Sequence, residues 1–267
     1  MANHMMPTSM ARALEKRGMA IGTWIFFRDP DICEMAAAAG FDFILINMEH
    51  GLLDLESVVN LIRAADCKGV DVIVRIPDGS KTTIMKVLDA GARGIFVPGV
   101  ETGQEAKEIV MAAKFAPEGT RSFSPTVRAN GYGRVNAAEF RAWSNRNVSV
   151  WLTLESKKAL ENMDSIMESG VNAVITGLFD LSVTLGFNDV NHPEMDKIMN
   201  KVAAGAQKNG VGLIASANIK VDTPERMLAT ARSWKARGAR YIFFGKDCSI
   251  LEEAYKTVVS TFHGTPL

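Results

Sequence analysis

The sequence is poor in cysteine and carries no excess of charge. Its three cysteines, Cys33, Cys67 and Cys248, lie far apart, and no Cys-x-x-Cys or zinc-type spacing occurs. Dispersed thiols in odd number argue against a disulfide framework and favour a reducing, cytoplasmic compartment. Lysine and arginine together number 30, as do aspartate and glutamate, so the formal net charge is zero. Charge therefore gives no reason to expect a nucleic acid or membrane partner.

Long apolar runs and nucleotide-binding motifs are also missing. No run of about 18 apolar residues is available to span a bilayer, and Met1–Pro7 lacks the apolar segment of a signal peptide. No G-x-G-x-x-G motif follows the first apolar segment, and no linker-like composition divides the chain. What remains is a typical globular composition, in a chain long enough for one α/β barrel of about 250 residues.

Short apolar segments recur along the chain, and most are followed by a segment of helical character. They cover residues 19–26, 43–47, 72–76, 94–98, 148–154, 173–176, 212–216 and 241–244. Such runs are typical of buried parallel strands, so eight repeats predict a single-domain (β/α)8 barrel over residues 1–267. An open doubly wound sheet is the alternative. Residues 1–10 are expected to be a flexible N-terminal segment. The polar stretch 116–147 is expected to be an irregular but ordered excursion, packed on the barrel or on a neighbouring subunit.

Two acids, Glu155 and Asp180, end the fifth and sixth apolar segments. Adjacent parallel strands point their carboxyl ends the same way, so we expect the two carboxylates side by side at one mouth of the sheet. Carboxylate oxygens suit a hard divalent cation that keeps open positions for other oxygen ligands. Either acid alone would more simply cap a helix or pair with a surface lysine. The pair at matching strand ends predicts a metal site.

A histidine and an arginine lie at further strand ends. His50 follows the second apolar segment, and Arg75 lies near the end of the third. An imidazole that titrates near neutrality suits a general base or proton shuttle, although a lone histidine is often structural. A guanidinium at the same mouth would bind an anionic, oxygen-rich substrate or pair with an acid.

Six motifs, in a fixed order, make the sequence recognisable as a member of a known family. They are G-F-D-F-I-L-I-N-M-E-H, V-I-V-R-I-P, K-V-L-D-A-G-A-R-G-I-F-V-P-G-V-E-T, F-A-P-E-G-T-R, L-E-S-K-K-A-L and T-G-L-F-D-L-S-V-T-L-G. With them the chain resembles the HpcH/HpaI aldolase family, the metal-dependent (class II) pyruvate aldolases, from about Arg12 to the last helix. The resemblance implies reversible aldol cleavage of a 4-hydroxy-2-oxo acid to pyruvate and an aldehyde. It also implies a divalent cofactor, Mg²⁺, Mn²⁺ or Co²⁺.

The resemblance assigns roles to individual positions. It implies metal ligands at Glu155 and Asp180, a catalytic base at His50, an arginine on the keto oxygen at Arg75, an acid partner of the histidine at Asp89, and a substrate-binding segment at Gly177–Asp180 that includes Gly177 and Phe179. It further implies a homo-oligomer, commonly a hexamer that is built from dimers in which the last helix is exchanged. The amphipathic segment 247–262 is compatible with that exchange.

Departures from the family pattern leave the substrate open. Asn47-Met48 replaces the usual Asp-Gly, Leu178-Phe179 replaces Pro-Ala, and Arg121-Ser122-Phe123-Ser124 replaces Arg-Gly-x-Gly. The alternatives are therefore a related lyase or decarboxylase, of the oxaloacetate decarboxylase or CoA-ester lyase type, and a decayed barrel acting as a binding protein. A Schiff-base aldolase would need a buried lysine on a strand, and Lys246, just after the eighth segment, is the only nearby candidate.

Overall fold

The computed structural model describes residues 8–217 and 223–263, which form a closed barrel of eight parallel strands in sequence order. Strand β8 pairs with β1, which closes the sheet and rules out the open doubly wound alternative. The strands are β1 Ala20–Ile25, β2 Phe43–Asn47, β3 Asp71–Arg75, β4 Gly94–Val97, β5 Ser149–Leu154, β6 Ala173–Thr176, β7 Gly212–Ala217 and β8 Ala239–Lys246. The predicted (β/α)8 barrel is confirmed.

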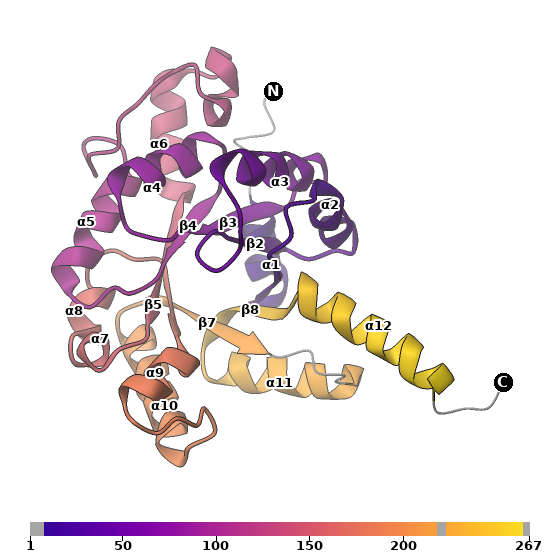
Figure 1. The fold of residues 1–267 in the computed structure, drawn as a ribbon. Coiled ribbons are helices and arrows are strands. Elements are labelled where there is room, and N and C mark those ends of the chain that lie inside the picture. Colours follow the sequence, from indigo (N-terminus) through magenta and orange to yellow (C-terminus); the bar gives the residue numbers. More distant parts are fainter. Residues whose placement is uncertain (1–7, 218–222, 264–267) are drawn as a thin grey trace.

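Most helices surround the barrel and lie between consecutive strands in the sequence, as Figure 1 shows, whereas α1 precedes β1 and α12 follows β8. They are α1 Ser9–Arg17, α2 Pro30–Ala38, α3 Leu55–Cys67, α4 Lys81–Asp89, α5 Gly103–Ala113, α6 Ala137–Asn147, α7 Lys157–Glu161, α8 Met163–Met167, α9 Leu178–Thr184, α10 Pro193–Lys208, α11 Pro224–Ala236 and α12 Asp247–His263. Side-chain caps fix where several begin: Asp54 accepts from the Ser57 amide, and Thr102 forms a capping box with Glu105. No helix in the described part of the chain is long and apolar enough to cross a membrane.

Aromatic side chains fill the barrel interior. The Trp24 ring packs edge-on against Phe243 at 5.1 Å between centroids, and Trp151 lies 4.7 Å from Tyr241. Gly22 is required beside them, because a Cβ at that position would overlap the Phe43 ring. A second, aliphatic layer separates the strands from the helices. The interior is therefore a packed core below the strand ends, not a channel.

The N-terminal end of the barrel is closed by α1. Thr8 caps this helix by accepting from the Ala11 amide, and Met10 donates its amide to Asp71 Oδ2 at 2.8 Å. Met10 and Ala13 are buried with the interior aromatic residues. The expectation of a flexible segment over residues 1–10 is therefore wrong for 8–10, because burial and capping fix them. Residues 1–7 lie outside the described part.

The segment 116–147 is less irregular than expected, because α6 occupies its last third and a short 3-10 helix, η2 Arg128–Gly133, lies before it. Phe115, Phe123 and Phe140 form a small core beneath it. The Asn145 side chain exchanges two hydrogen bonds with the Phe115 backbone, at 2.8 and 2.9 Å. These contacts hold the segment against the barrel of its own chain.

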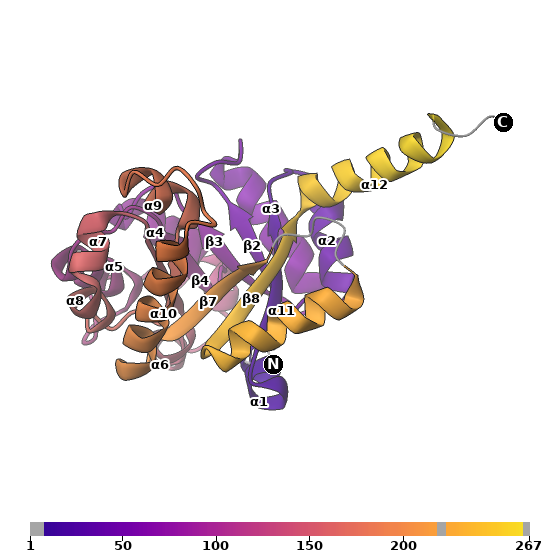
Figure 2. The same cartoon turned by 90° about the horizontal axis from the view of Figure 1, so that it is seen from below.

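Helix α12 leaves the barrel after β8 and projects from it, as Figures 1 and 2 both show. Asp247, its first residue, is the only buried one among its described residues. Several large apolar side chains along it are exposed: Ile250, Tyr255, Val258, Val259 and Phe262.

Candidate active site

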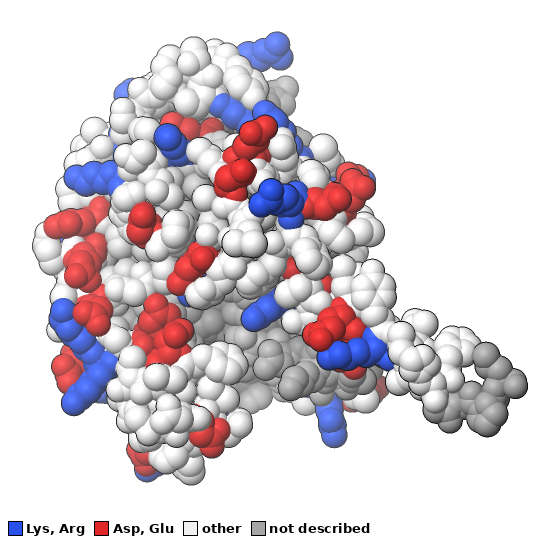
Figure 3. Space-filling view, in the orientation of Figure 1, with Lys and Arg blue, Asp and Glu red and all other residues white. Residues whose placement is uncertain are grey.

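A cavity of about 180 Å³ opens at the carboxyl ends of the strands. It receives side chains from all eight strands or the turns after them, which is where barrel enzymes place their chemistry. Its described lining includes six of the predicted site residues: His50, Arg75, Glu155, Gly177, Phe179 and Asp180. In the space-filling view the surface is hollowed between the part that carries α9 and α10 and the base of α12 (Figure 3). Charges of both signs are dispersed over this face.

The two predicted metal ligands lie close together. Strands β5 and β6 pair with Leu154 opposite Thr176, so their ends are adjacent. Asp180 lies in the first turn of α9 and not at the strand end itself, a correction to the sequence-based placement. Burial raises the pKa of the Glu155 carboxyl, and the negative charge of Asp180 adds to this. Glu155 is half-buried and Asp180 is exposed, and their two negative charges would repel each other without a cation.

Local backbone features position the Glu155 carboxylate. Its Oε1 accepts a hydrogen bond from the Gly99 amide at 2.6 Å. A Cβ on Gly177 would lie 2.6 Å from the Glu155 Cβ and 2.9 Å from its Oε2, so only glycine leaves space for this carboxylate. Thr153, two residues earlier on β5, faces the same cavity, and its buried hydroxyl has no hydrogen-bond partner among the described residues.

Glu49 links the arginine to the histidine. Its carboxylate forms an ion pair with the Arg75 Nε and lies 3.6 Å from the His50 Nε2. The Arg75 guanidinium carbon lies 5.9 Å from the Trp24 ring centroid and 5.5 Å from that of Phe96. Arg75 is thereby fixed on one wall. The His50 side chain, 62% exposed, stays accessible at the mouth.

Asn47, one of the departures from the family pattern, has a structural role. Its buried side-chain Oδ1 accepts hydrogen bonds from the amides of Glu49 and His50, both at 3.0 Å. This holds the turn that presents the His50 ring. An amide oxygen makes these two bonds without the negative charge that aspartate would bring next to His50.

Asp89 is not among the residues that line the cavity. It ends α4, close to the start of β4, whereas His50 follows the end of β2. Because the strands are parallel, these positions belong to opposite ends of the barrel. The Asp89 carboxylate instead accepts from Arg121 Nη2 at 2.6 Å. Within one chain Asp89 therefore does not approach His50, and the implied catalytic role stays a prediction.

Known proteins resemble the whole of this architecture. The model of the HpcH/HpaI aldolase/citrate lyase family matches residues 20–244. The chain belongs to this family. A 5-keto-4-deoxy-D-glucarate aldolase of Shigella dysenteriae serotype 1 is 29% identical over 268 residues, 98% of this chain and 99% of the relative. The HpcH/HpaI aldolase structure from Desulfitobacterium hafniense DCB-2 has 28% identity and a TM-score of 0.86, over 96% of this chain and 97% of that chain. Macrophomate synthase, with 27% identity, has a TM-score of 0.81 over 96% and 88% of the two chains.

Membership of the HpcH/HpaI family confirms the expected class of enzyme. The chain is a carbon–carbon lyase of the metal-dependent aldolase type, as its six motifs predicted, and aldol cleavage fits the named relatives. Membership of this class argues against two of the alternatives, a catalytically decayed barrel and a Schiff-base aldolase.

The donor set fits the divalent metal that this aldolase class uses. Glu155 and Asp180 offer hard carboxylate oxygens, and magnesium is commonly held by one or two carboxylates with other positions left to water and substrate. Within residues 8–217 and 223–263, no three His, Cys, Asp or Glu side chains form a fuller metal cage. The residues present are therefore compatible with an open site that also accepts substrate oxygens.

Sequence reasoning gave no role to several residues in and around the cavity. Glu49 is a strand-end acid that lies outside the cavity lining, and nothing local revealed that it contacts Arg75. Thr153 could have been found, because it precedes Glu155 by two and strand side chains alternate. Lys246 was placed after the eighth strand. It is the last residue of β8 and lines the cavity.

Proposed function

We propose that Glu155, Asp180, Arg75 and His50 carry out reversible aldol cleavage of a 4-hydroxy-2-oxo acid. The observation that supports this most is that these four side chains, which lie at or shortly after the ends of four different strands, line one cavity. The metal ligands and the proton-transfer group would then face a single small substrate.

A divalent cation held by Glu155 and Asp180, Mg²⁺, Mn²⁺ or Co²⁺, would supply Lewis-acid polarisation of the 2-oxo group. Arg75, held by Glu49 against the aromatic wall, would donate hydrogen bonds to the 2-oxo oxygen and stabilise the negative charge that develops there. The backbone of Gly177–Asp180 would hold the substrate carboxylate, beside Phe179.

His50 would take the proton of the C4 hydroxyl, directly or through a water. The electrons of the O–H bond form the aldehyde carbonyl, and those of the C3–C4 bond pass into the enolate of pyruvate. A proton added at C3 completes pyruvate, and His50 returns to its neutral state after giving up its proton. Glu49, at 3.6 Å from the His50 Nε2, would orient the ring through this cycle.

The names of the relatives give the simplest expectation for the substrate. Their name, 5-keto-4-deoxy-D-glucarate aldolase, makes that sugar acid the first substrate to test. The alternative is a related lyase or decarboxylase. Macrophomate synthase, at a similar identity, carries a different named activity on the same fold, and Phe179 changes the cavity rim.

The deciding experiment is a substrate screen on the purified protein with each divalent metal. Formation of pyruvate from 4-hydroxy-2-oxo acids, lost with EDTA and regained with Mg²⁺, Mn²⁺ or Co²⁺, supports the proposal. Exchange of the methyl protons of pyruvate with deuterated water tests the enolate step alone. If oxaloacetate yields pyruvate while no 4-hydroxy-2-oxo acid is cleaved, the decarboxylase alternative replaces it.

We also propose that the protein is a cytoplasmic homo-oligomer in which α12 packs on a neighbouring copy, with a hexamer as the expected assembly. The exposed apolar side chains of α12, Tyr255, Val258 and Phe262 among them, support this, because a helix with such a surface normally buries it. The cytoplasmic location rests on the three unpaired cysteines.

A further inference from the structure

Asp247 is a buried acid that ties the end of β8 to the loop after β1. It is 6% exposed and is the first residue of α12. Its Oδ2 accepts hydrogen bonds from the amides of Phe26 and Phe27, both at 2.8 Å, and its Oδ1 accepts from the Cys248 amide at 2.7 Å. Hydrogen bonds to a carboxylate are stronger than those between neutral groups. A single side chain therefore fixes both the backbone at Phe26 and the start of α12.

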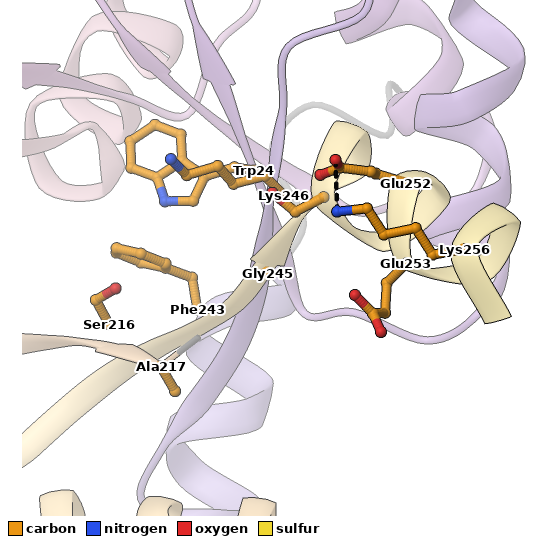
Figure 4. Close-up of a pocket in the computed structure, with 10 residues that line it drawn as sticks. Trp24, Ser216, Ala217, Phe243, Gly245, Lys246, Glu252, Glu253 and Lys256 are labelled. Carbon is orange, nitrogen blue, oxygen red and sulfur yellow. Dashed lines mark ion pairs between the residues drawn. The ribbon is translucent and has the colours of Figure 1, made fainter. Parts of the chain in front are cut away.

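The side chain of Phe26 extends from this fixed backbone into the wall of the active-site cavity. Phe26 is one of the lining residues, and its ring centroid lies 6.3 Å from that of Trp24 and 5.4 Å from the Lys246 ammonium. Figure 4 shows Lys246 extended toward Trp24, at the point where β8 passes into α12. Asp247 is not among the described residues that line the cavity. Any effect of Asp247 on the reaction must therefore act through the wall that it holds.

Phe26 lies across the barrel from the first of the two proposed metal ligands. In the closed strand order β1 and β5 are opposite each other, with three strands between them on either side. Phe26 follows β1, and Glu155 follows β5. In the proposed mechanism the pyruvate unit is bound beside Glu155. The part of the substrate that leaves as the aldehyde is then the part that extends toward Phe26.

The groups of the enolate step are held by other contacts. Arg75 forms an ion pair with Glu49, and the Trp24 ring near it packs against Phe243 at 5.1 Å between centroids. None of these contacts involves Asp247. A change at Asp247 should therefore shift the aldehyde end of the cavity and leave the metal end in place.

We propose that Asp247 is a positioning residue that fixes Phe26 as the wall against which the aldehyde part of the substrate is bound. This rests on the proposed aldol function, and it adds a residue outside the cavity to those that control the reaction. Loss of the carboxylate leaves the amides of Phe26 and Phe27 without their acceptor, so the ring is no longer held in one place. A shift of about 1 Å in a positioning contact costs on the order of a hundredfold in rate.

The test compares two reactions of the purified enzyme with the same divalent metal. One is aldol condensation of pyruvate with butanal, and the other is exchange of the methyl protons of pyruvate with deuterated water. Asp247→Ala should lower kcat/KM for condensation by about ten- to a hundredfold and change the exchange rate by less than about twofold. Asp247→Asn should restore most of the condensation, because an amide oxygen accepts two backbone amides equally well, as Asn47 Oδ1 does at 3.0 Å.

Asp42→Ala is the matched control, because Asp42 holds the other end of the same strand. Its Oδ2 accepts from the Ile21 amide at 2.8 Å and pairs with Arg17. Its loss should lower stability without changing the ratio of condensation to exchange. Phe26→Ala should show the same selective loss as Asp247→Ala. The double variant should lose no more than Phe26→Ala alone, because Asp247 acts through that ring.

An equal loss of condensation and exchange in Asp247→Ala would mean that this acid only holds the fold, and it overturns the proposal. The same fall of the ratio in Asp42→Ala, or additive losses in the double variant, also overturns it. If Asp247→Ala does not fold, Asp247→Ser takes its place, because a serine hydroxyl still caps α12 but reaches less far toward the Phe26 amide. Failure of the aldol function itself looks different: the wild type then neither condenses butanal nor exchanges the protons of pyruvate.

Discussion

The carboxylate of Asp89 accepts a hydrogen bond from the Arg121 guanidinium, whose side chain is 1% exposed. Burial lowers the pKa of Arg121, and Asp89 opposes that shift by its hydrogen bond and its charge. The pair anchors the segment after α5 to the end of α4. In one chain its role is to hold the fold, which is distinct from the catalytic role that family resemblance implies.

Asp89→Asn should therefore destabilise the protein, by about 2–3 kcal/mol, because it leaves a buried guanidinium without a counter-charge. Urea unfolding measures the loss. If the role is structural, kcat below the melting transition should stay within about twofold of the wild type. Asp66→Asn, which breaks the more exposed pair with Arg128, is the control and should cost less. A large fall in kcat at unchanged stability would instead support the catalytic role.

Removal of either proposed metal ligand should strongly lower activity and weaken its activation by metal. Glu155→Gln and Asp180→Asn each remove one anionic oxygen ligand, and we expect kcat/KM to fall by about a hundredfold or more. Titration of activity with Mn²⁺ should show weaker activation in both variants. Glu101→Gln is the control, because Glu101 pairs with Lys158 outside the cavity. Wild-type activity at low micromolar metal would show that the mutated residue is not a ligand.

Without metal, Glu155 should make the stability of the protein depend on pH. Its pKa is raised in the folded state, chiefly by burial, so the folded form binds the proton more tightly than the unfolded form. The favourable contribution is present below the ordinary carboxyl pKa and is lost as pH rises through the folded value. In EDTA, Glu155→Gln should therefore gain stability relative to the wild type as pH rises from about 4. If the urea midpoints of the wild type and of Glu155→Gln change in parallel with pH over this range, the expected effect of Glu155 is contradicted.

Much of the fold was predictable because barrel strands are short apolar runs and their order is the order of the sequence. The helix starts at Asp54, Ser80 and Thr102 were likewise local signals, since a capping side chain contacts its own helix. The proximity of Glu155 and Asp180 needed only the rule that parallel strand ends meet, although Asp180 itself lies in the first turn of α9. Contacts between segments far apart in sequence could not be predicted this way. The local sequence pattern does not specify that Glu49, just after β2, pairs with Arg75 on the neighbouring strand β3.

Two elements were missed for a different reason. Helix α1 begins at Ser9 behind a threonine cap, but its polar sequence has too few apolar residues to stand out from a flexible segment. Helix α6 lies in a stretch rich in polar residues, and its stability comes from burying Phe140 and Trp143 against the barrel. Tertiary packing, not local preference, decides such helices.

The exposed face of α12 should control the assembly state. We expect the double variant Val258→Asp and Phe262→Asp to release smaller species, because charges in an apolar interface are costly to bury. Light scattering after size exclusion gives the mass, and circular dichroism checks that helix content is kept. Thr257→Asp adds one charge at a polar position on the same helix and serves as the control. A wild-type protein that is monomeric at micromolar concentration would contradict the proposed exchange.

Phe179 should limit which acceptors fit, because it lines the cavity beside Asp180 and is 71% exposed at the rim. A phenyl ring there narrows the space beyond the pyruvate unit. Phe179→Ala should raise kcat/KM for bulky aldehydes relative to small ones by a factor that corresponds to about 1–3 kcal/mol per contact group. Exchange of pyruvate protons, which needs only the metal end, should change little.

Val183→Ala is the matched control for this variant. Val183 lies on the same helix, is also exposed, and is not among the cavity-lining residues, so its loss should not alter the acceptor ratio. Equal ratios of large to small acceptors in Phe179→Ala and the wild type would mean that the ring does not bound the pocket. Loss of pyruvate exchange in the same variant would place its effect at Asp180, because the ring would then be needed to hold the adjacent carboxylate and not to select the aldehyde.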